Sequence, residues 1–93
     1  MVVGVLQVEL HIPNAQSLKE RRAVLNSLKD QPRSRFNISV AQLGSDEKWQ
    51  RAMIGVSTVG DDRIHVQGSL RRVVEWLRMS RLIELIRIEE DYL

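Results

Sequence analysis

The sequence predicts an α+β fold in which a four-stranded antiparallel sheet carries two helices on one face. Apolar residues alternate with polar ones in four segments and recur at helical spacing in two others. These segments follow one another as strand, helix, strand, strand, helix and strand, the order of the ferredoxin-like βαββαβ arrangement. With 93 residues, 43 % of them apolar, the chain suits one core and is too short for two. We therefore expect a single domain over residues 1–93.

The first predicted strand covers residues 2–12 and has one apolar and one half-polar face. The apolar face holds Val2, Leu6, Val8, Leu10 and Ile12, and the half-polar face holds Val3, Val5, Gln7, Glu9 and His11. Pro13 and Asn14 end the strand.

The first predicted helix begins after Ser17, whose spacing from Glu20 makes a capping box. Its apolar stripe consists of Leu18, Val24, Leu25 and Leu28. Pro32 is expected to limit or kink the helix near its end. By helical phase Arg21 lies inside the stripe, so its side chain must reach the edge or pair with a carboxylate. We favour a structural ion pair over a ligand-binding role for this arginine.

Two strands are predicted in the middle of the chain. Phe36, Ile38 and Val40 alternate with polar or small residues up to 41, and a turn follows at Gly44, Ser45 and Asp46. In the next strand, which ends at Gly60, Ala52, Ile54 and Val56 face one way and Arg51, Met53 and Ser57 face the other.

The second predicted helix follows a cap at Asp61 or Asp62. Its apolar positions are Leu70, Val73, Val74 and Leu77. Gly68 is a weak point inside it. Residues 82–93 form a β-rich run that closes the sheet.

The composition argues against several chemistries. The chain has no cysteine, which excludes disulfides and thiolate sites and fits a cytoplasmic setting. We expect no signal peptide and no membrane span, because polar residues interrupt the apolar start. His11 and His65 are the only histidines and lie far apart in the chain, and no phosphate-binding glycine loop is present. We expect no catalytic residues, no metal and no cofactor.

Charge is distributed unevenly although the net charge is only +2. Residues 17–35 carry six cations and two acids, residues 63–81 carry five cations and one acid, and residues 82–93 are acidic. Eleven of the fourteen cations are arginine, which binds phosphate or carboxylate in a forked geometry. This pattern has two explanations, a surface rich in ion pairs or an anionic partner.

Three stretches, SLKERR, RFNISVAQ and WQRAMIGVSTV, resemble successive motifs of the YlxP-like family of small bacterial proteins. The resemblance covers most of the chain. It implies a ferredoxin-like fold, a bacterial cytoplasmic protein and a gene beside translation and transcription factors. The family's function is uncharacterised or loosely tied to ribosome and RNA biology. Two positions depart from the pattern: Pro32 replaces a residue that continues the helix, and Gln42 stands where an acid is common.

The predicted topology brings many cations to one end of the domain, beside the free N–H groups of the first helix. The candidate RNA or anion site consists of Ser17, Lys19, Arg21, Arg22, Lys48, Arg51, Arg78 and Arg81. We therefore expect a non-catalytic RNA- or ribosome-associated module that binds the phosphate backbone of ribosomal or other RNA. The central strands lack the paired aromatic residues that stack bases in RNA-recognition modules.

The alternative function uses the open face of the sheet. Its candidate residues are Glu9, His11, Trp49 and Met53. Such a half-polar face serves a homodimer, another protein partner or a small ligand. A steep fall of binding with salt would favour RNA over apolar association.

Overall fold

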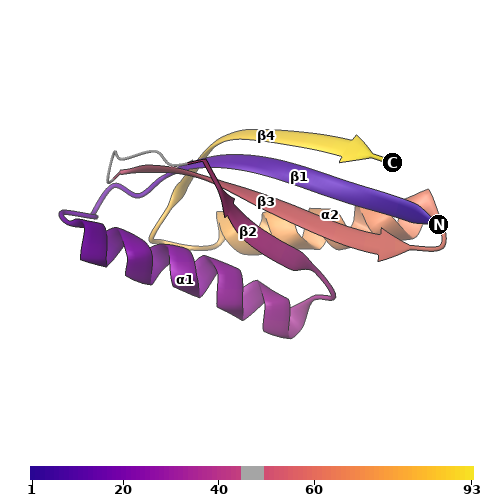
Figure 1. Ribbon diagram of the computed structural model, residues 1–93, viewed down its shortest axis with the longest axis horizontal. Helices are drawn as coiled ribbons and strands as arrows, with labels where there is room; N and C mark the ends of the chain where they lie inside the picture. The colour runs from indigo at the N-terminus through magenta and orange to yellow at the C-terminus, as the bar shows by residue number, and fades with distance from the viewer. Residues whose placement is uncertain (45–49) are drawn as a thin grey trace.

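The computed structural model describes residues 1–44 and 50–93 (Figure 1). It has the predicted order of elements. In chain order these are β1 (Val2–His11), α1 (Leu18–Arg35), β2 (Ser39–Leu43), β3 (Arg51–Gly60), α2 (Arg63–Arg78) and β4 (Glu84–Tyr92). The predicted turn residues Ser45 and Asp46 and the candidate site residues Lys48 and Trp49 fall between the two described ranges.

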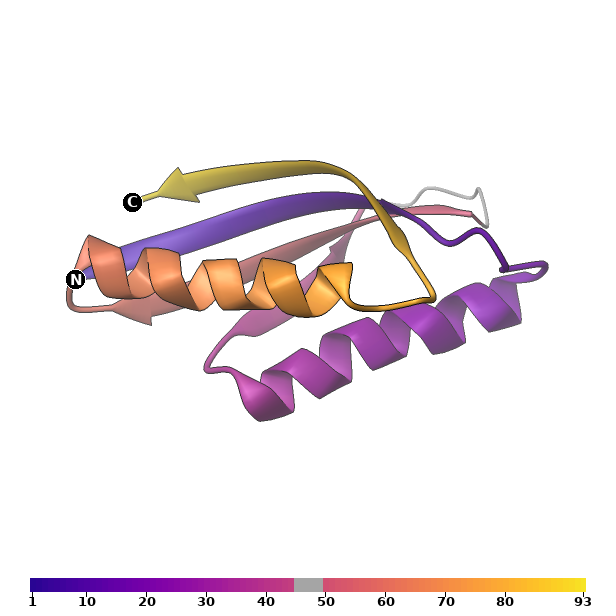
Figure 2. The ribbon, with the colours of Figure 1, turned by 180° about the vertical axis from the view of Figure 1, so that it is seen from behind.

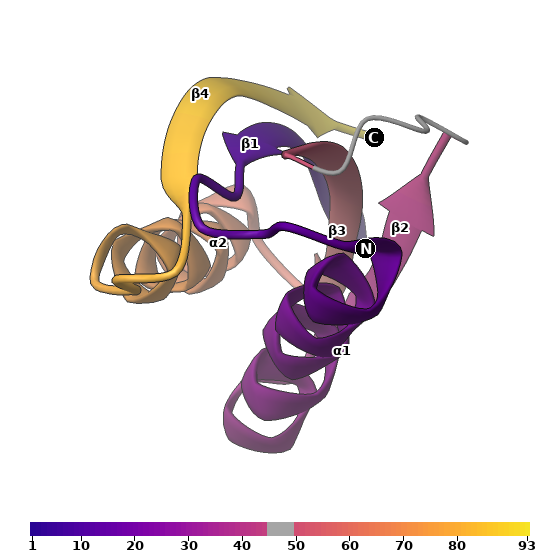
Figure 3. The same ribbon diagram turned by 90° about the vertical axis from the view of Figure 1, so that its left-hand side faces the viewer.

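The four strands form one antiparallel sheet in the order β2-β3-β1-β4. Both helices cover the same face of this sheet and leave the other face open (Figures 2 and 3). The predicted ferredoxin-like class is confirmed. The register pairs Val2 with Gly60 and His11 with Arg51 along β1 and β3. The end of β1, the start of β3 and the start of β4 therefore lie together.

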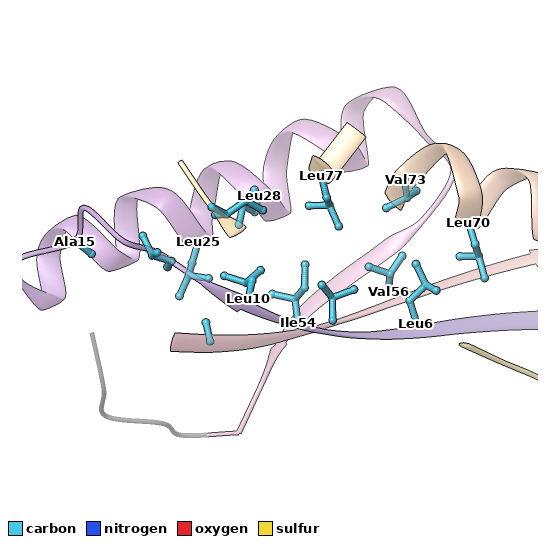
Figure 4. Close-up of a cluster of buried hydrophobic side chains, with 14 of the residues drawn as sticks. Leu6, Leu10, Ala15, Leu25, Leu28, Ile54, Val56, Leu70, Val73 and Leu77 are labelled. Atoms are coloured by element: carbon cyan, nitrogen blue, oxygen red, sulfur yellow. The ribbon is translucent and has the colours of Figure 1, made fainter. Parts of the chain in front are cut away.

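The core fills the space between the sheet and the two helices (Figure 4). Alternation in the strands and helical periodicity place its members on facing surfaces. The buried side chains include Leu6, Leu10, Leu25, Leu28, Ile54, Val56, Leu70, Val73 and Leu77. Burying each of these side chains stabilises the fold by roughly 2 kcal/mol relative to exposure. The predicted apolar faces of β1 and β3 are thus confirmed.

Helix α2 packs directly on the backbone of β1 at Gly4. A Cβ built on Gly4 would lie 2.5 Å from Val66 Cγ1 and 2.8 Å from Leu70 Cδ1. Such distances leave no room for a larger residue. Gly4 therefore sets how closely the helix approaches the sheet.

The start of β2 differs from the sequence prediction, because α1 continues past Pro32. Helix α1 runs three residues beyond Pro32 to Arg35, and the carbonyl of Pro32 accepts from the N–H of Phe36. The proline removes one helical hydrogen bond, but its ring is buried against the core and the helix continues after it. Because the helix is longer, Phe36 caps it and β2 begins only at Ser39.

Within residues 1–44 and 50–93, no helix is long and apolar enough to cross a membrane.

Candidate nucleic-acid interface

The start of α1 is capped by its own side chains. Ser17 Oγ accepts from the N–H of Glu20 at 3.1 Å, and Glu20 Oε2 accepts from the N–H of Gln16 at 2.6 Å. This is the predicted capping box. The carboxylate of Glu20 already occupies the positive end of the helix, so Ser17 acts as a cap and leaves less of the helix terminus for an external anion.

Arg21 points inward from α1 and is only 6 % exposed. Its Nε and Nη2 donate to the main-chain carbonyl of Arg51 at 3.4 and 3.3 Å. With the Gln42 amide oriented so that its oxygen faces Arg21, this oxygen accepts from Nη2 at 3.2 Å and Nη1 at 3.3 Å. Arg21 thus ties α1 to β2 and β3. It belongs to the interior, and the basic surface does not include it.

Arg51 directs its side chain to the open face of the sheet. Its Nη1 lies 3.4 Å from Glu9 Oε1, and beside this pair His11 Nδ1 lies 3.6 Å from Glu84 Oε2. Glu9 is also directly opposite Met53 in the register of β1 and β3. The candidate residues Glu9, His11 and Met53 therefore share the open face as predicted, whereas Arg51 does not join the cations of α1.

Arg78 and Arg81 are exposed at and just after the end of α2. This end lies beside the middle and second half of α1, where a hollow of about 300 Å³ separates the two helices. Its lining includes Ser27, Gln31, Arg35, Trp76, Met79 and Leu82. Lys19 and Arg22 are exposed near the start of α1, with Lys19 about 13 Å along the helix from the lining residue Leu28. These four cations belong to one helix layer without forming a tight cluster.

The two layers of the molecule carry opposite charge. Helix α1 has six cations against two acids and α2 has four against one, a net charge of +7 for the two helices. The four strands have two cations against five acids, a net charge of −3. The charged segments are evident in the sequence, but their separation into a basic and an acidic layer follows from the packing of both helices on one face of the sheet.

A second hollow, of about 360 Å³, lies on the open face of the sheet and was not predicted. Its floor is Gly55, in the middle of β3, and its lining includes Val5, Ser39, Ala41, Leu43 and Ser57. Leu43 leans over the glycine, since a Cβ on Gly55 would be 3.0 Å from Leu43 Cδ1. A glycine inside a predicted strand was the available signal, because it often marks close approach of another group.

The family described as "Protein of unknown function (DUF503)" matches residues 3–90. The chain belongs to the DUF503 family. A relative of this DUF503 chain, the "Uncharacterized protein YlxP" of Bacillus subtilis (strain 168), is 33 % identical over 76 residues, which are 82 % of the chain and 83 % of the relative. The resemblance to YlxP-like proteins is therefore confirmed. Neither description assigns an activity to a DUF503 protein.

Proposed function

We propose that this protein is a non-catalytic RNA-binding module that contacts phosphates through its helix layer. The observation that supports the proposal is the separation of charge, with a net +7 on the two helices and −3 on the strands. The contact residues proposed are the exposed cations Lys19, Arg22, Arg78 and Arg81. A basic face of this kind attracts a polyanion, while the acidic sheet disfavours binding on the opposite side.

Lys19 and Arg22 are suited to a shared phosphate run. They are three positions apart, so they are neighbours on one surface of α1. Neutralising several phosphates releases condensed counterions, which drives binding without contact to bases. Arginine adds a forked geometry that matches phosphate oxygens.

The mode of recognition proposed is backbone or shape readout of structured RNA, with ribosomal RNA as the first partner to test. Recognition modules of this fold that read bases stack them on aromatic residues of the open sheet face. On the part of that face that the structure describes, the residues are instead ion pairs such as Arg51 with Glu9, and small or aliphatic side chains. Backbone contacts position a protein on RNA without reading its sequence.

The test measures binding by fluorescence anisotropy on a ribosomal RNA fragment and on an unrelated duplex, at low and high salt. The double variant Lys19→Glu with Arg22→Glu is expected to lose affinity by about tenfold or more, because it reverses the local field. The matched control is Lys29→Glu with Arg33→Glu, farther along the same helix. The control should lose much less, since Arg33 Nη2 already lies 2.6 Å from Asp30 Oδ1.

Two results would overturn the proposal. The first is that the parent protein binds neither RNA at low salt, which would exclude the RNA function. The second is that both double variants lose affinity equally, which would mean that the binding is diffuse charge attraction without a defined site. Affinity that falls steeply with salt in the parent, and less steeply in the Lys19/Arg22 variant, supports phosphate contacts.

The hollow over Gly55 favours a second candidate function, a protein-interaction or small-ligand module that uses the open sheet face. Its apolar lining gives association a hydrophobic driving force. Val5→Glu with Met53→Glu would abolish association through this face and leave RNA binding by the helix layer unchanged. Sedimentation and anisotropy on the same variant therefore separate the two functions.

A further inference from the structure

The two edges of the sheet differ in their protection against pairing with another strand. Edge strand β4 carries five charged residues, which are Glu84, Arg87, Glu89, Glu90 and Asp91. The opposite edge, β2, has the sequence SVAQL and contains no charge, no proline and no glycine. Charged side chains and prolines are the usual means of blocking an exposed edge. Strand β2 has neither.

Among residues 1–44 and 50–93, the elements around β2 leave its outer edge accessible. Helix α1 lies below the sheet and β2 forms the rim (Figure 3). On the open face, Ser39, Ala41 and Leu43 border the apolar hollow over Gly55. On the helix face, Val40 packs against the core and Gln42 contacts Arg21. The backbone groups that β2 does not use toward β3 point away from the sheet.

We propose that two copies of this chain associate by antiparallel pairing of β2 with β2, about a two-fold axis at Ala41. This register alone pairs all five residues of the strand, because Ser39 then faces Leu43 of the second copy and Val40 faces its Gln42. Centring the axis on Val40 or Gln42 would pair strand residues with residues outside the strand. Ala41 at the axis places two small, exposed side chains where the copies come closest.

A second copy suits this edge better than a charged partner. Side by side, the two strands bring no like charges together, since β2 has none. Leu43 of each copy falls near Ser39 and Ala41 of the other, so the two apolar hollows adjoin across the axis. The result is a continuous eight-stranded sheet, twice the four strands of one copy.

The pairing also orients the helix layers. A two-fold axis through antiparallel edge strands is perpendicular to the sheet, so the helices of both copies lie on the same side. The two basic layers then form one extended surface. The association itself does not rest on RNA binding and is tested without RNA.

Cysteine cross-linking tests the register directly, because the chain has no cysteine of its own. Across an antiparallel pair the two Cα atoms of Ala41→Cys would be about 4.5 to 5.5 Å apart, within the range of a disulfide. We expect mild oxidation to convert this variant to a covalent dimer. Ser39→Cys should not cross-link to itself, because the two copies of position 39 would be roughly 13 Å apart along the strands.

Two matched variants complete the test. Ser39→Cys with Leu43→Cys should cross-link, since these positions face each other across the axis. Asp91→Cys on the charged edge β4 should not. In sedimentation without cross-linking, Ala41→Lys should raise the dimer dissociation constant by about tenfold or more, because two ammonium groups meet at the axis. Circular dichroism should be unchanged, since Ala41 is exposed.

A parent chain that sediments as a monomer at every concentration would overturn the proposal. So would a dimer that survives Ala41→Lys and is lost in Val5→Glu with Met53→Glu, since the open face would then form the interface. Efficient self-cross-linking at position 40 or 42, without any at 41, would overturn the register.

Discussion

Arg21 Nη2 donates to the main-chain carbonyl of Arg51 at 3.3 Å and joins positions thirty residues apart in the chain. Replacing Arg21 with methionine keeps an apolar stem but leaves this carbonyl without its donor. We expect Arg21→Met to lower the free energy of unfolding by about 2 kcal/mol, the cost of losing a charged hydrogen bond in a part-buried site. Urea denaturation measures the loss. The matched control Arg22→Met, one position along and exposed, should stay within about 0.5 kcal/mol of the parent.

Gln42 holds the amide that faces the Arg21 guanidinium. Gln42→Glu replaces a hydrogen bond with one charged partner, the guanidinium, by an ion pair between two charged groups. We expect a gain in the free energy of unfolding of about 0.5 to 1 kcal/mol at neutral pH. The gain should vanish in the Arg21→Met background, measured as a double-mutant cycle. It should also disappear as acid protonates the new carboxylate, and an equal gain in both backgrounds would contradict the pairing.

Ser17 satisfies the N–H of Glu20 at the start of α1. Removing the hydroxyl in Ser17→Ala should lower the free energy of unfolding by about 1 kcal/mol. Chemical denaturation monitored by circular dichroism provides the measurement. No loss beyond experimental error would mean that α1 begins elsewhere. Asp62→Ala at the start of α2 should cost a similar amount, because Asp62 Oδ1 accepts from the N–H of His65 at 2.8 Å.

Two glycine-to-alanine substitutions should change the free energy of unfolding in opposite directions. Gly4→Ala forces a methyl group against Val66 and Leu70, and we expect a loss of about 1 to 3 kcal/mol from overpacking. Gly68 lies inside α2, and the nearest atom to its built Cβ is Arg72 Nη1 at 3.7 Å. Gly68→Ala should therefore stabilise the helix by up to about 1 kcal/mol. The midpoint of thermal unfolding, measured for each variant, should fall in Gly4→Ala and rise in Gly68→Ala if α2 packs closely on β1 at Gly4.

The pKa of Tyr92 is raised above its ordinary value, first by burial and then by the carboxylate of Glu90, which accepts from the hydroxyl at 2.8 Å. Arg63, 4.7 Å from the ring centre, acts in the opposite direction. Tyr92 is the only tyrosine, so an ultraviolet titration follows it alone. Glu90→Gln should lower its pKa and Arg63→Gln should raise it further. Because the neutral phenol is favoured in the fold, its contribution to stability is complete below about pH 10 and is lost as pH rises through the folded pKa.

Much of the fold could be predicted because its signals are local. Alternation in β1 and β3 assigned each side chain to a face. Ser17 marked the start of α1, and the choice of Asp61 or Asp62 marked the start of α2, which the structure caps with Asp62. The start of β2 was predicted too early, because α1 continues for three residues after Pro32, whose ring packs in the core. That packing comes from distant residues, so no local pattern contains it.

The candidate site was predicted in part. The exposed positions of Lys19 and Arg22 followed from helical phase, and Glu9, His11 and Met53 from strand alternation. The position of Arg21 on the opposite side of the sheet from Arg51 could not be predicted from these patterns. Their side chains lie on opposite sides of the sheet, one buried under α1 and one paired with Glu9 on the open face.

The sequence by itself determined the order of the elements, the faces of the central strands and the excess of positive charge in the two helices. These properties depend on periodicity and composition, which neighbouring residues specify. Only the tertiary structure decided which groups Arg21 bonds to, that a hollow opens over Gly55, and that one edge of the sheet is charged and the other is not. The physical reason is that these features arise where segments distant in the chain meet, and local periodicity does not specify which surfaces meet or how closely they pack.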